Sequence, residues 1–248
     1  MNILVCISHV PDTTSKINFK DNDTAFDTNG VQFVMNPNDE FGLTRAIWFQ
    51  EQQGAHITVL NVGESDSEPT LRKALAIGAN EAIRVNALPT DGYFVAQQIA
   101  AVVKNGQYDL IIAGKESLDY NGGMVPGMVA GLLNYQFVNS CVSLQVEGTA
   151  VTAAREIDGG KEILSTNLPL VIGGQKGLVE EKDLKIPNMR GIMNARTKTL
   201  TVVEPITIDQ ATNAVRFEKP AAKSAVKIIP ADQLDQLIAL LHNEAKVI

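Results

Sequence analysis

Short apolar runs alternate with amphipathic stretches along the first half of the chain. Each apolar run has the length of a strand and few polar positions, as expected of strands that are buried on both faces of a sheet. Each amphipathic stretch carries apolar residues at helical spacing. The predicted strands occupy residues 2–7, 56–62, 82–85 and 108–113, and the predicted helices occupy residues 41–54, 67–78, 92–105 and 124–133. This alternation predicts an α/β fold with three layers, in which a mostly parallel sheet lies between two layers of helices.

The pattern changes after residue 133. Residues 138–148, 149–160 and 161–174 read as three successive strands, joined by glycine-containing turns at Gly148 and at Asp158-Gly159-Gly160. Strands joined by such short turns predict an antiparallel extension of the sheet. A short helix at 187–193 and a last strand at 199–203 are expected to follow.

The C-terminal part of the chain has a different character. Residues 204–229 show little periodicity and are predicted to form an extended arm. Residues 230–246 carry Leu234, Leu237, Ile238 and Leu241 at helical spacing, which predicts a terminal amphipathic helix. Because so short a helix cannot bury its own apolar face, we expect a partner there. The chain is therefore divided into an α/β domain, residues 1–203, and an arm with a helix, residues 204–248.

Two further features lie between the first two predicted strands. Residues 17–34 predict a hairpin around Asn29-Gly30, a strong turn signal. The stretch Asn36-Pro37-Asn38-Asp39 has the composition of a helix start: a side-chain cap, a proline in the first turn and an acid where the macrodipole favours it. This capping role requires no ligand.

The stretch 108–133 is the most informative for function. It combines a buried strand, a polar loop with Gly122 and Gly123, and the start of a glycine-spaced helix. Glycines let the backbone approach a ligand, and the first N–H groups of a helix attract an anion. Ligands of parallel sheets bind beyond the carboxyl ends of the strands. A Gly-Gly loop is also common as a simple tight connection, so this loop alone does not define a site.

The charge and hydropathy of the chain exclude two classes of partner. A net charge of −7 argues against nucleic-acid binding, which requires a basic surface. No apolar run reaches the roughly 18 residues of a membrane span, so the chain is expected not to span a membrane. The N-terminus enters a strand with no targeting segment ahead of it, which predicts a cytoplasmic protein. Late basic residues are mixed with acids and form either a solvated face or a partner surface: Lys182, Lys185, Arg190, Arg196 and Lys198.

The candidate catalytic chemistry is sparse. Cys6 and Cys141 have no metal or redox spacing, and Cys6 is expected to be a small buried hydrophobe. A nucleotide hydrolase or ligase is disfavoured because no Gly-Lys-Ser/Thr phosphate loop, carboxylate pair with a base or metal cluster is present. Lys115, Glu116 and Asp119 come nearest to catalytic groups, although solvated loop positions are favoured for them. We therefore expect no enzyme activity of the chain's own.

Several segments, taken together and in order, resemble the β subunit of electron transfer flavoprotein. The resemblance covers nearly all of residues 1–203. It rests on LVCISHVPD (4–12), NPNDEFGLTRAI (36–47), KALAIGANEAIRV (73–85), YDLIIAGKESLDYN (108–121), AREIDGGKE (154–162), LPLVI (168–172) and PNMRGIMNARTKTLTVVEP (187–205). A stand-alone adenine-nucleotide-binding module of the universal-stress-protein kind is the alternative. Such a module would account for the α/β half and the loop, but not for the antiparallel extension, the arm or the last helix.

The resemblance implies an electron-carrying subunit with the fold of adenine nucleotide α-hydrolase-like domains. In that family a larger α subunit holds the redox FAD. The β subunit holds AMP in many members and a second FAD in the bifurcating branch, and both remain open here. The implied partners are the α subunit and flavoproteins of the acyl-CoA dehydrogenase type, both contacted by the arm and C-terminal helix. Electrons would pass between these dehydrogenases and a downstream acceptor.

Matched position by position, the resemblance also implies a nucleotide site. Strand ends would contact the adenine through the backbone, and N–H groups of the loop and helix start would bind phosphate. In the loop, Gly123, Met124 and Val125 replace the Asn-Gln-Thr of the AMP-binding pattern, which leaves phosphate binding to the bare backbone. The implied site residues are Cys6, Asn36, Pro37, Asn38, Asp39, Val62, Gly114, Lys115, Asp119, Asn121, Gly122, Gly123, Met124 and Val125.

Overall fold

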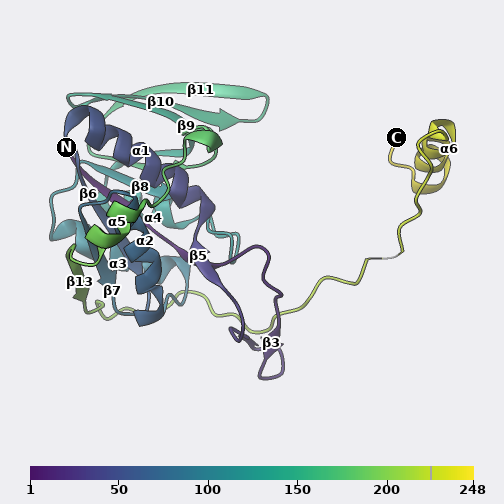
Figure 1. The fold of residues 1–248 in the computed structure, drawn as a ribbon, viewed down its shortest axis with the longest axis horizontal. Helices are drawn as coiled ribbons and strands as arrows, with labels where there is room; N and C mark the ends of the chain where they lie inside the picture. The colour runs from purple at the N-terminus through teal and green to yellow at the C-terminus, as the bar shows by residue number, and fades with distance from the viewer. Residues whose placement is uncertain (224) are drawn as a thin grey trace.

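A computed structural model describes residues 1–223 and 225–248 of the chain. Its body is built on one nine-stranded sheet with strand order β11-β10-β9-β12-β8-β1-β6-β7-β13 (Figure 1). The strands of this sheet are β1 (Asn2–Cys6), β6 (His56–Val62), β7 (Glu81–Val85), β8 (Leu110–Gly114), β9 (Gln136–Glu147), β10 (Ala150–Ile157), β11 (Gly160–Asn167), β12 (Leu170–Gly174) and β13 (Leu200–Val203). The predicted α/β fold is confirmed.

The centre of the sheet is parallel, and the chain reverses its direction of winding there. β1 pairs in parallel with both β6 and β8, so that Val5 lies between Val59 and Ile112. From β1 the chain winds outwards through β6 and β7, and then crosses back to place β8 on the other side of β1. The carboxyl ends of β1 and β8 therefore form a topological switch point, the position where open α/β sheets bind ligands.

Helices cover both faces of this sheet, because alternate side chains of each strand point to opposite faces. Ile3 and Val5 face one core with residues of α1 and α2, whereas Leu4 faces a second core with residues of α3 and α4. The helices are α1 (Pro37–Gln53), α2 (Glu68–Ile77), α3 (Gly92–Lys104), α4 (Val125–Leu133), α5 (Met189–Ala195) and α6 (Leu234–Ala239), with short turns η1 (Ser65–Ser67), η2 (Glu181–Asp183) and η3 (Leu240–Ala245). These two cores are what make the domain three-layered.

The antiparallel extension differs from the prediction at one point. β9, β10 and β11 are antiparallel neighbours, as expected. The predicted third strand, residues 161–174, is instead two strands, because β12 returns to the parallel sheet between β8 and β9. The chain breaks at Leu168-Pro169, where proline has no N–H to continue a ladder of hydrogen bonds.

The predicted hairpin over residues 17–34 is wrong in its pairing. β3 (Phe19–Lys20) pairs with β4 (Ala25–Phe26) around a turn in which Asp21, Asn22 and Asp23 have φ of 56°, 58° and 62°. Asn and Asp tolerate this left-handed conformation better than most residues. β5 (Phe33–Met35) pairs instead with β2 (His9–Pro11), which places Val34 opposite the buried Val10.

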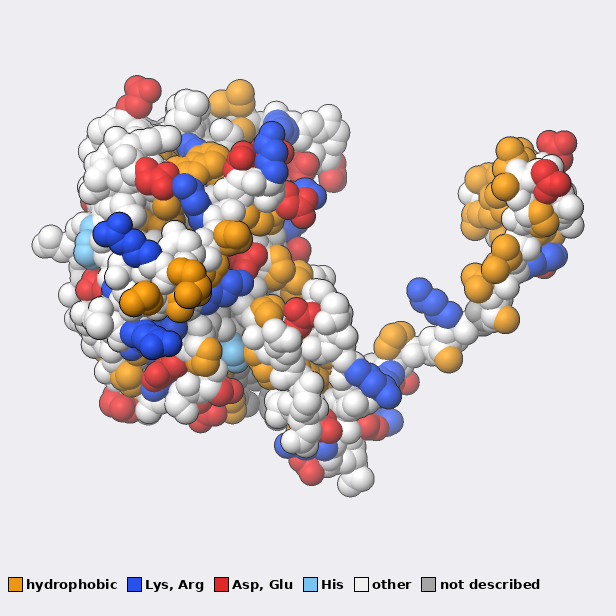
Figure 2. All heavy atoms as spheres, in the orientation of Figure 1, with side chains coloured by type: hydrophobic (Ala, Val, Ile, Leu, Met, Phe, Trp, Pro, Cys, Tyr) orange, Lys and Arg blue, Asp and Glu red, His pale blue; other side chains and the backbone are white. Residues whose placement is uncertain are grey.

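The last part of the chain, with its terminal helix, lies away from the body of the molecule (Figure 1). Among the described residues after Val203, the first helix or strand is α6, which continues into η3. This helical segment stands apart from the sheet in Figure 1, and Figure 2 shows hydrophobic side chains gathered on it. Leu234, Leu237 and Ile238 are exposed there. Nowhere in the described chain is a helix long and apolar enough to cross a membrane.

Candidate functional site

The fold brings the predicted site residues to one edge of the sheet. Cys6, Val62 and Gly114 are the last residues of β1, β6 and β8, three adjacent parallel strands. Helix α1 begins at Pro37, immediately after Asn36. The first turn of α1 is therefore positioned over the switch point, where its side chains reach the strand ends.

Asp39 joins the two strand ends at the switch point. Its carboxylate accepts a hydrogen bond from the Ser8 N–H at 2.7 Å and another from the Gly114 N–H at 2.8 Å. The side chain is buried. Burial raises the pKa of Asp39 to about 7, although hydrogen bonds from Ser8, Asn36 and Gly114 act in the opposite direction. One buried carboxylate thus fixes the spacing of β1, β8 and α1.

Asn36 and Asn38 attach the glycine-containing loop to the start of α1. Their side-chain amides both donate to the Glu116 carbonyl, at 2.9 Å and 3.2 Å. The prediction that a side chain caps α1 is wrong: Asn36 makes no capping hydrogen bond. Its amide faces the loop instead, so this residue serves the site rather than the helix.

The buried Asn36 also leaves one polar atom open. Its Oδ1 has no hydrogen-bond partner among the described residues, although its side chain is almost completely buried. An unpaired buried acceptor is costly, and a ligand that brings a hydrogen-bond donor would relieve that cost. The neighbouring Gly114 lets Asn36 and Asp39 pack directly against the end of β8, because a side chain there would meet both.

The loop from Lys115 to α4 is held by backbone contacts. The Ser117 N–H donates to the Gly122 carbonyl at 3.1 Å, and Asn121 adopts a left-handed φ of 54°. No side chain caps the start of α4 at Met124, so the N–H groups of Val125 and Gly127 are left uncapped, whereas Pro126 between them has no N–H. The loop can offer these N–H groups to a phosphate.

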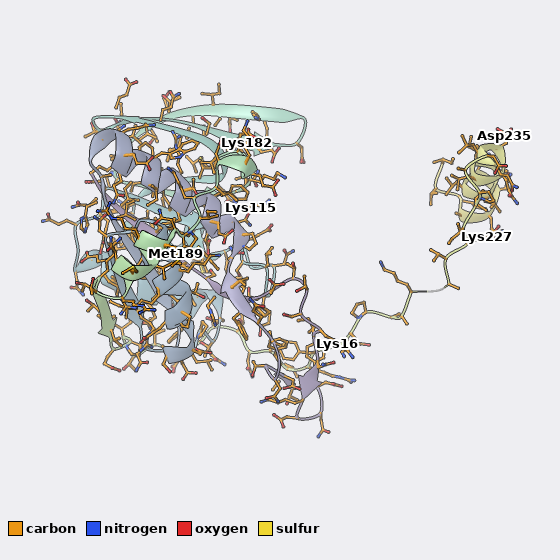
Figure 3. The ribbon with its side chains drawn as sticks, in the orientation of Figure 1. Lys16, Lys115, Lys182, Met189, Lys227 and Asp235 are labelled. Atoms are coloured by element: carbon orange, nitrogen blue, oxygen red, sulfur yellow. The ribbon has the colours of Figure 1, made fainter. Side chains whose placement is uncertain are left out.

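The polar side chains of the loop show no catalytic arrangement. The Asp119 carboxylate accepts from the Tyr120 N–H at 2.9 Å. The Nζ of Lys115, a residue labelled in Figure 3, is 3.8 Å from a carboxylate oxygen of Glu116. Within the described residues no group of His, Cys, Asp or Glu could hold a metal ion. Burial raises the pKa of the Cys6 thiol and raises that of Cys141 to about 11, so both remain protonated small hydrophobes.

Three contributors were not predicted from the sequence. The Ser8 N–H and the Glu116 carbonyl belong to the backbone, which residue types do not reveal. Asn61 donates to the Ile7 carbonyl at 2.8 Å, and its Oδ1 is buried without a partner among the described residues. A signal for Asn61 existed, because it is the one amide within the apolar run 56–62.

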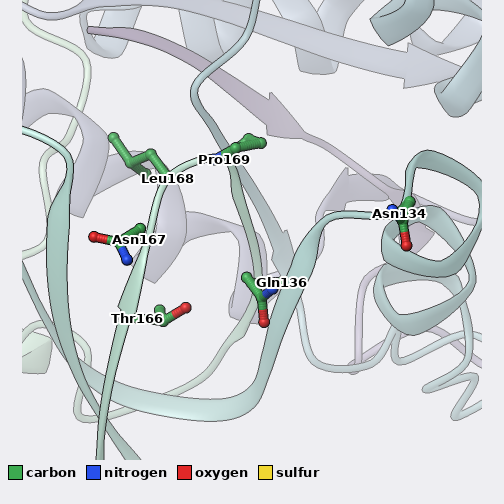
Figure 4. Close-up of a pocket in the computed structure, with 6 residues that line it drawn as sticks. All are labelled: Asn134, Gln136, Thr166, Asn167, Leu168 and Pro169. Carbon is green, nitrogen blue, oxygen red and sulfur yellow. The ribbon is translucent and has the colours of Figure 1, made fainter.

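Two cavities lie away from this edge. One, of about 160 Å³, is at the beginning of β9 and β12 and is lined by Asn134, Gln136, Thr166, Asn167, Leu168 and Pro169 (Figure 4). The other, of about 260 Å³, runs beside α3 and includes Gln98 and Ile206. Neither contains a predicted site residue, and the first lies at the amino ends of its strands, where parallel sheets do not place their ligands.

Comparison with known proteins identifies the class to which this fold and site belong. Residues 23–208 match the model of the electron transfer flavoprotein domain. The chain is 32% identical to electron transfer flavoprotein subunit beta of Bacillus subtilis, with both chains covered completely. It is 31% identical to the protein of the same name from Syntrophomonas wolfei, covering all of this chain and 98% of that one, and 28% identical to the human one, covering 100% and 99%.

The chain belongs to the electron transfer flavoprotein family. The relatives that it matches over their full length are β subunits, and this supports the role of an electron-transfer β subunit for the chain. The resemblance found from the sequence is confirmed, and a stand-alone nucleotide-binding module is not favoured.

We predict that Asp39 makes stability depend on pH. Its folded-state pKa of about 7 lies above the unfolded value of about 4. Between about pH 4 and pH 7 the folded state therefore keeps a proton on Asp39 that the unfolded state has lost. The free energy of unfolding relative to Asp39→Asn should therefore fall by a few kcal/mol as the pH rises from about 4 to about 7. Urea unfolding of both proteins at pH 5 and pH 8 measures this, and a difference that stays constant would contradict it.

Proposed function

We propose that the chain is the β subunit of a heterodimer that carries electrons between flavoproteins of the acyl-CoA dehydrogenase type and a downstream acceptor. The redox FAD would be held by the α subunit or shared with it. The observation that carries this proposal is the full-length match to β subunits. The chain would perform no bond chemistry of its own, and we propose the cytoplasm as its location.

We further propose that residues 6, 36–39, 62 and 114–125 bind AMP or a second FAD. The unpaired Asn36 Oδ1 would accept from the adenine, and strand-end backbone groups would contact the ring. The uncapped start of α4 would donate to phosphate. When bound, the nucleotide would supply either a structural anchor or a second redox centre.

We propose that the arm and C-terminal helix, residues 204–248, contact the α subunit. They form a unit distinct from the α/β domain, residues 1–203. The support is the exposed apolar side of α6, where 61% of Leu234 and 55% of Ile238 are accessible. An isolated helix with such a face gains stability only against another protein.

A second exposed apolar surface is the candidate contact for dehydrogenases. We name Ile186, Met189, Ile192 and Met193 the α5 surface; Met189 is 76% and Met193 67% exposed. Figure 3 shows Met189 and Lys182 on the viewed face of the body. Of the basic residues nearby, Lys185 pairs with Glu51, and Lys198 donates to carbonyls at the end of α2. Flexible methionines suit a surface that several partners contact.

Co-purification with an electron transfer flavoprotein α subunit from the same organism tests the proposed function. We expect a stable heterodimer that releases, after denaturation, two nucleotides that mass spectrometry identifies. Two FAD per heterodimer would place the chain in the bifurcating branch, and one FAD with one AMP would make its own nucleotide structural. If no heterodimer forms, the proposed function is wrong.

The α5 surface has its own test. The double variant Met189→Ser/Met193→Ser should raise the KM for an acyl-CoA dehydrogenase at least tenfold. The reason is that apolar anchors dominate the binding energy of an interface. The measurement is the dehydrogenase-dependent reduction of the heterodimer. Ile163→Ser, at a 73% exposed position on β11, is the matched control and should change nothing. Equal KM values for both variants would exclude this surface as the docking site.

A further inference from the structure

The first part of the arm is attached to the body at successive points. Ile206 exchanges two hydrogen bonds with the side chain of Gln98, at 2.8 Å and 2.9 Å, and Gln98 is buried in α3. Farther along, one carboxylate oxygen of Asp91 accepts from the N–H groups of Ala211 and Thr212, both at 2.7 Å. The arm therefore follows α3 towards its first residue.

Asp91 places the arm beside the candidate nucleotide loop. Its other carboxylate oxygen caps α3 by accepting from the Phe94 N–H at 2.7 Å. The next residue, Gly92, lies against Met124, since a methyl group added to Gly92 would be 2.7 Å from the Met124 Cγ. Met124 ends the loop, so the second attachment of the arm adjoins one end of that loop.

The third attachment reaches the other part of the loop. The Phe217 N–H donates to the Asp23 carbonyl at 2.8 Å, and the Phe217 ring stacks on Phe19 with ring centroids 5.1 Å apart. The same ring contacts Tyr120, with centroids 6.4 Å apart and an angle of 37° between the planes. Phe217 is thus packed between the β3–β4 hairpin and the loop.

Tyr120 has little other support. Its side chain is 68% exposed, and it precedes Asn121, the residue with the left-handed φ of 54°. A loop that binds phosphate with its backbone must hold those N–H groups in one conformation, and ordering each residue costs free energy. An aromatic contact made before the ligand arrives reduces that cost at binding.

We propose that Phe217 of the arm is a positioning residue of the nucleotide site, which holds the loop of residues 115–124 through Tyr120 in the conformation that binds the phosphate of an adenine nucleotide. This rests on the proposed nucleotide site. Phe217 need not touch the ligand, because it acts through Tyr120. The arm, which continues to the helix assigned to the α subunit, then forms part of the site that it crosses.

The test has one readout that requires no nucleotide. Hydrogen exchange of the loop amides is measured in the full-length heterodimer freed of nucleotide. Phe217→Ala should raise exchange at residues 119–123 about three- to tenfold, the range of one aromatic contact. Phe217→Tyr keeps the ring and should restore the wild-type exchange. Val215→Ala, at an 80% exposed arm position two residues away, is the matched control.

The second readout is the dissociation rate of fluorescent methylanthraniloyl-AMP from the same heterodimers. Phe217→Ala should raise this rate three- to tenfold, and in a Tyr120→Ala background it should have no further effect. The proposal is overturned if Phe217→Ala gives the same loop exchange as Val215→Ala. It is also overturned if Phe217→Ala raises the dissociation rate as much in the Tyr120→Ala background as in the wild type. If the wild type binds no methylanthraniloyl-AMP, the proposed AMP site fails, and the exchange data alone decide whether Phe217 holds the loop.

Discussion

The hydrogen bonds from the Ser8 and Gly114 N–H groups to the buried Asp39 carboxylate are the constraint on which the site depends. They connect two parallel strands, β1 and β8, at the point where the sheet reverses its winding. Because Asp39 lies in the first turn of α1, the same bonds place Asn36 and Asn38 against the loop. The strand ends, the helix start and the loop are therefore one rigid arrangement rather than three neighbours.

The groups at this edge are suited to binding a ligand. The donors are backbone N–H groups, the open acceptor is an amide oxygen, and both cysteines are buried and protonated at neutral pH. In the proposed function these groups would hold the nucleotide. The apolar surfaces that a partner requires lie elsewhere, on α6 and on the α5 surface.

Local patterns in the sequence predicted most elements, whereas pairings over long distances were missed. The buried strands were found because the runs at 2–7, 56–62 and 108–113 are continuous and apolar. The pairing of β5 with β2 was missed because a three-residue strand carries almost no periodicity. The residue type of Asn36 predicts a helix cap, because asparagine is a common cap and its type does not reveal that its amide contacts the loop. The contact between Phe217 and Tyr120 joins residues almost a hundred positions apart, and no local pattern encodes it.

Photoaffinity labelling of the heterodimer with azido-AMP tests most directly whether the switch-point edge is the nucleotide site. Peptide mass spectrometry locates the attached nucleotide, and excess unlabelled AMP or FAD serves as competitor. We expect competed label on peptides that contain residues 36–39 or 114–125. Competed label confined to the cavity lined by Asn134 and Pro169, or to the groove beside α3, would contradict the central claim.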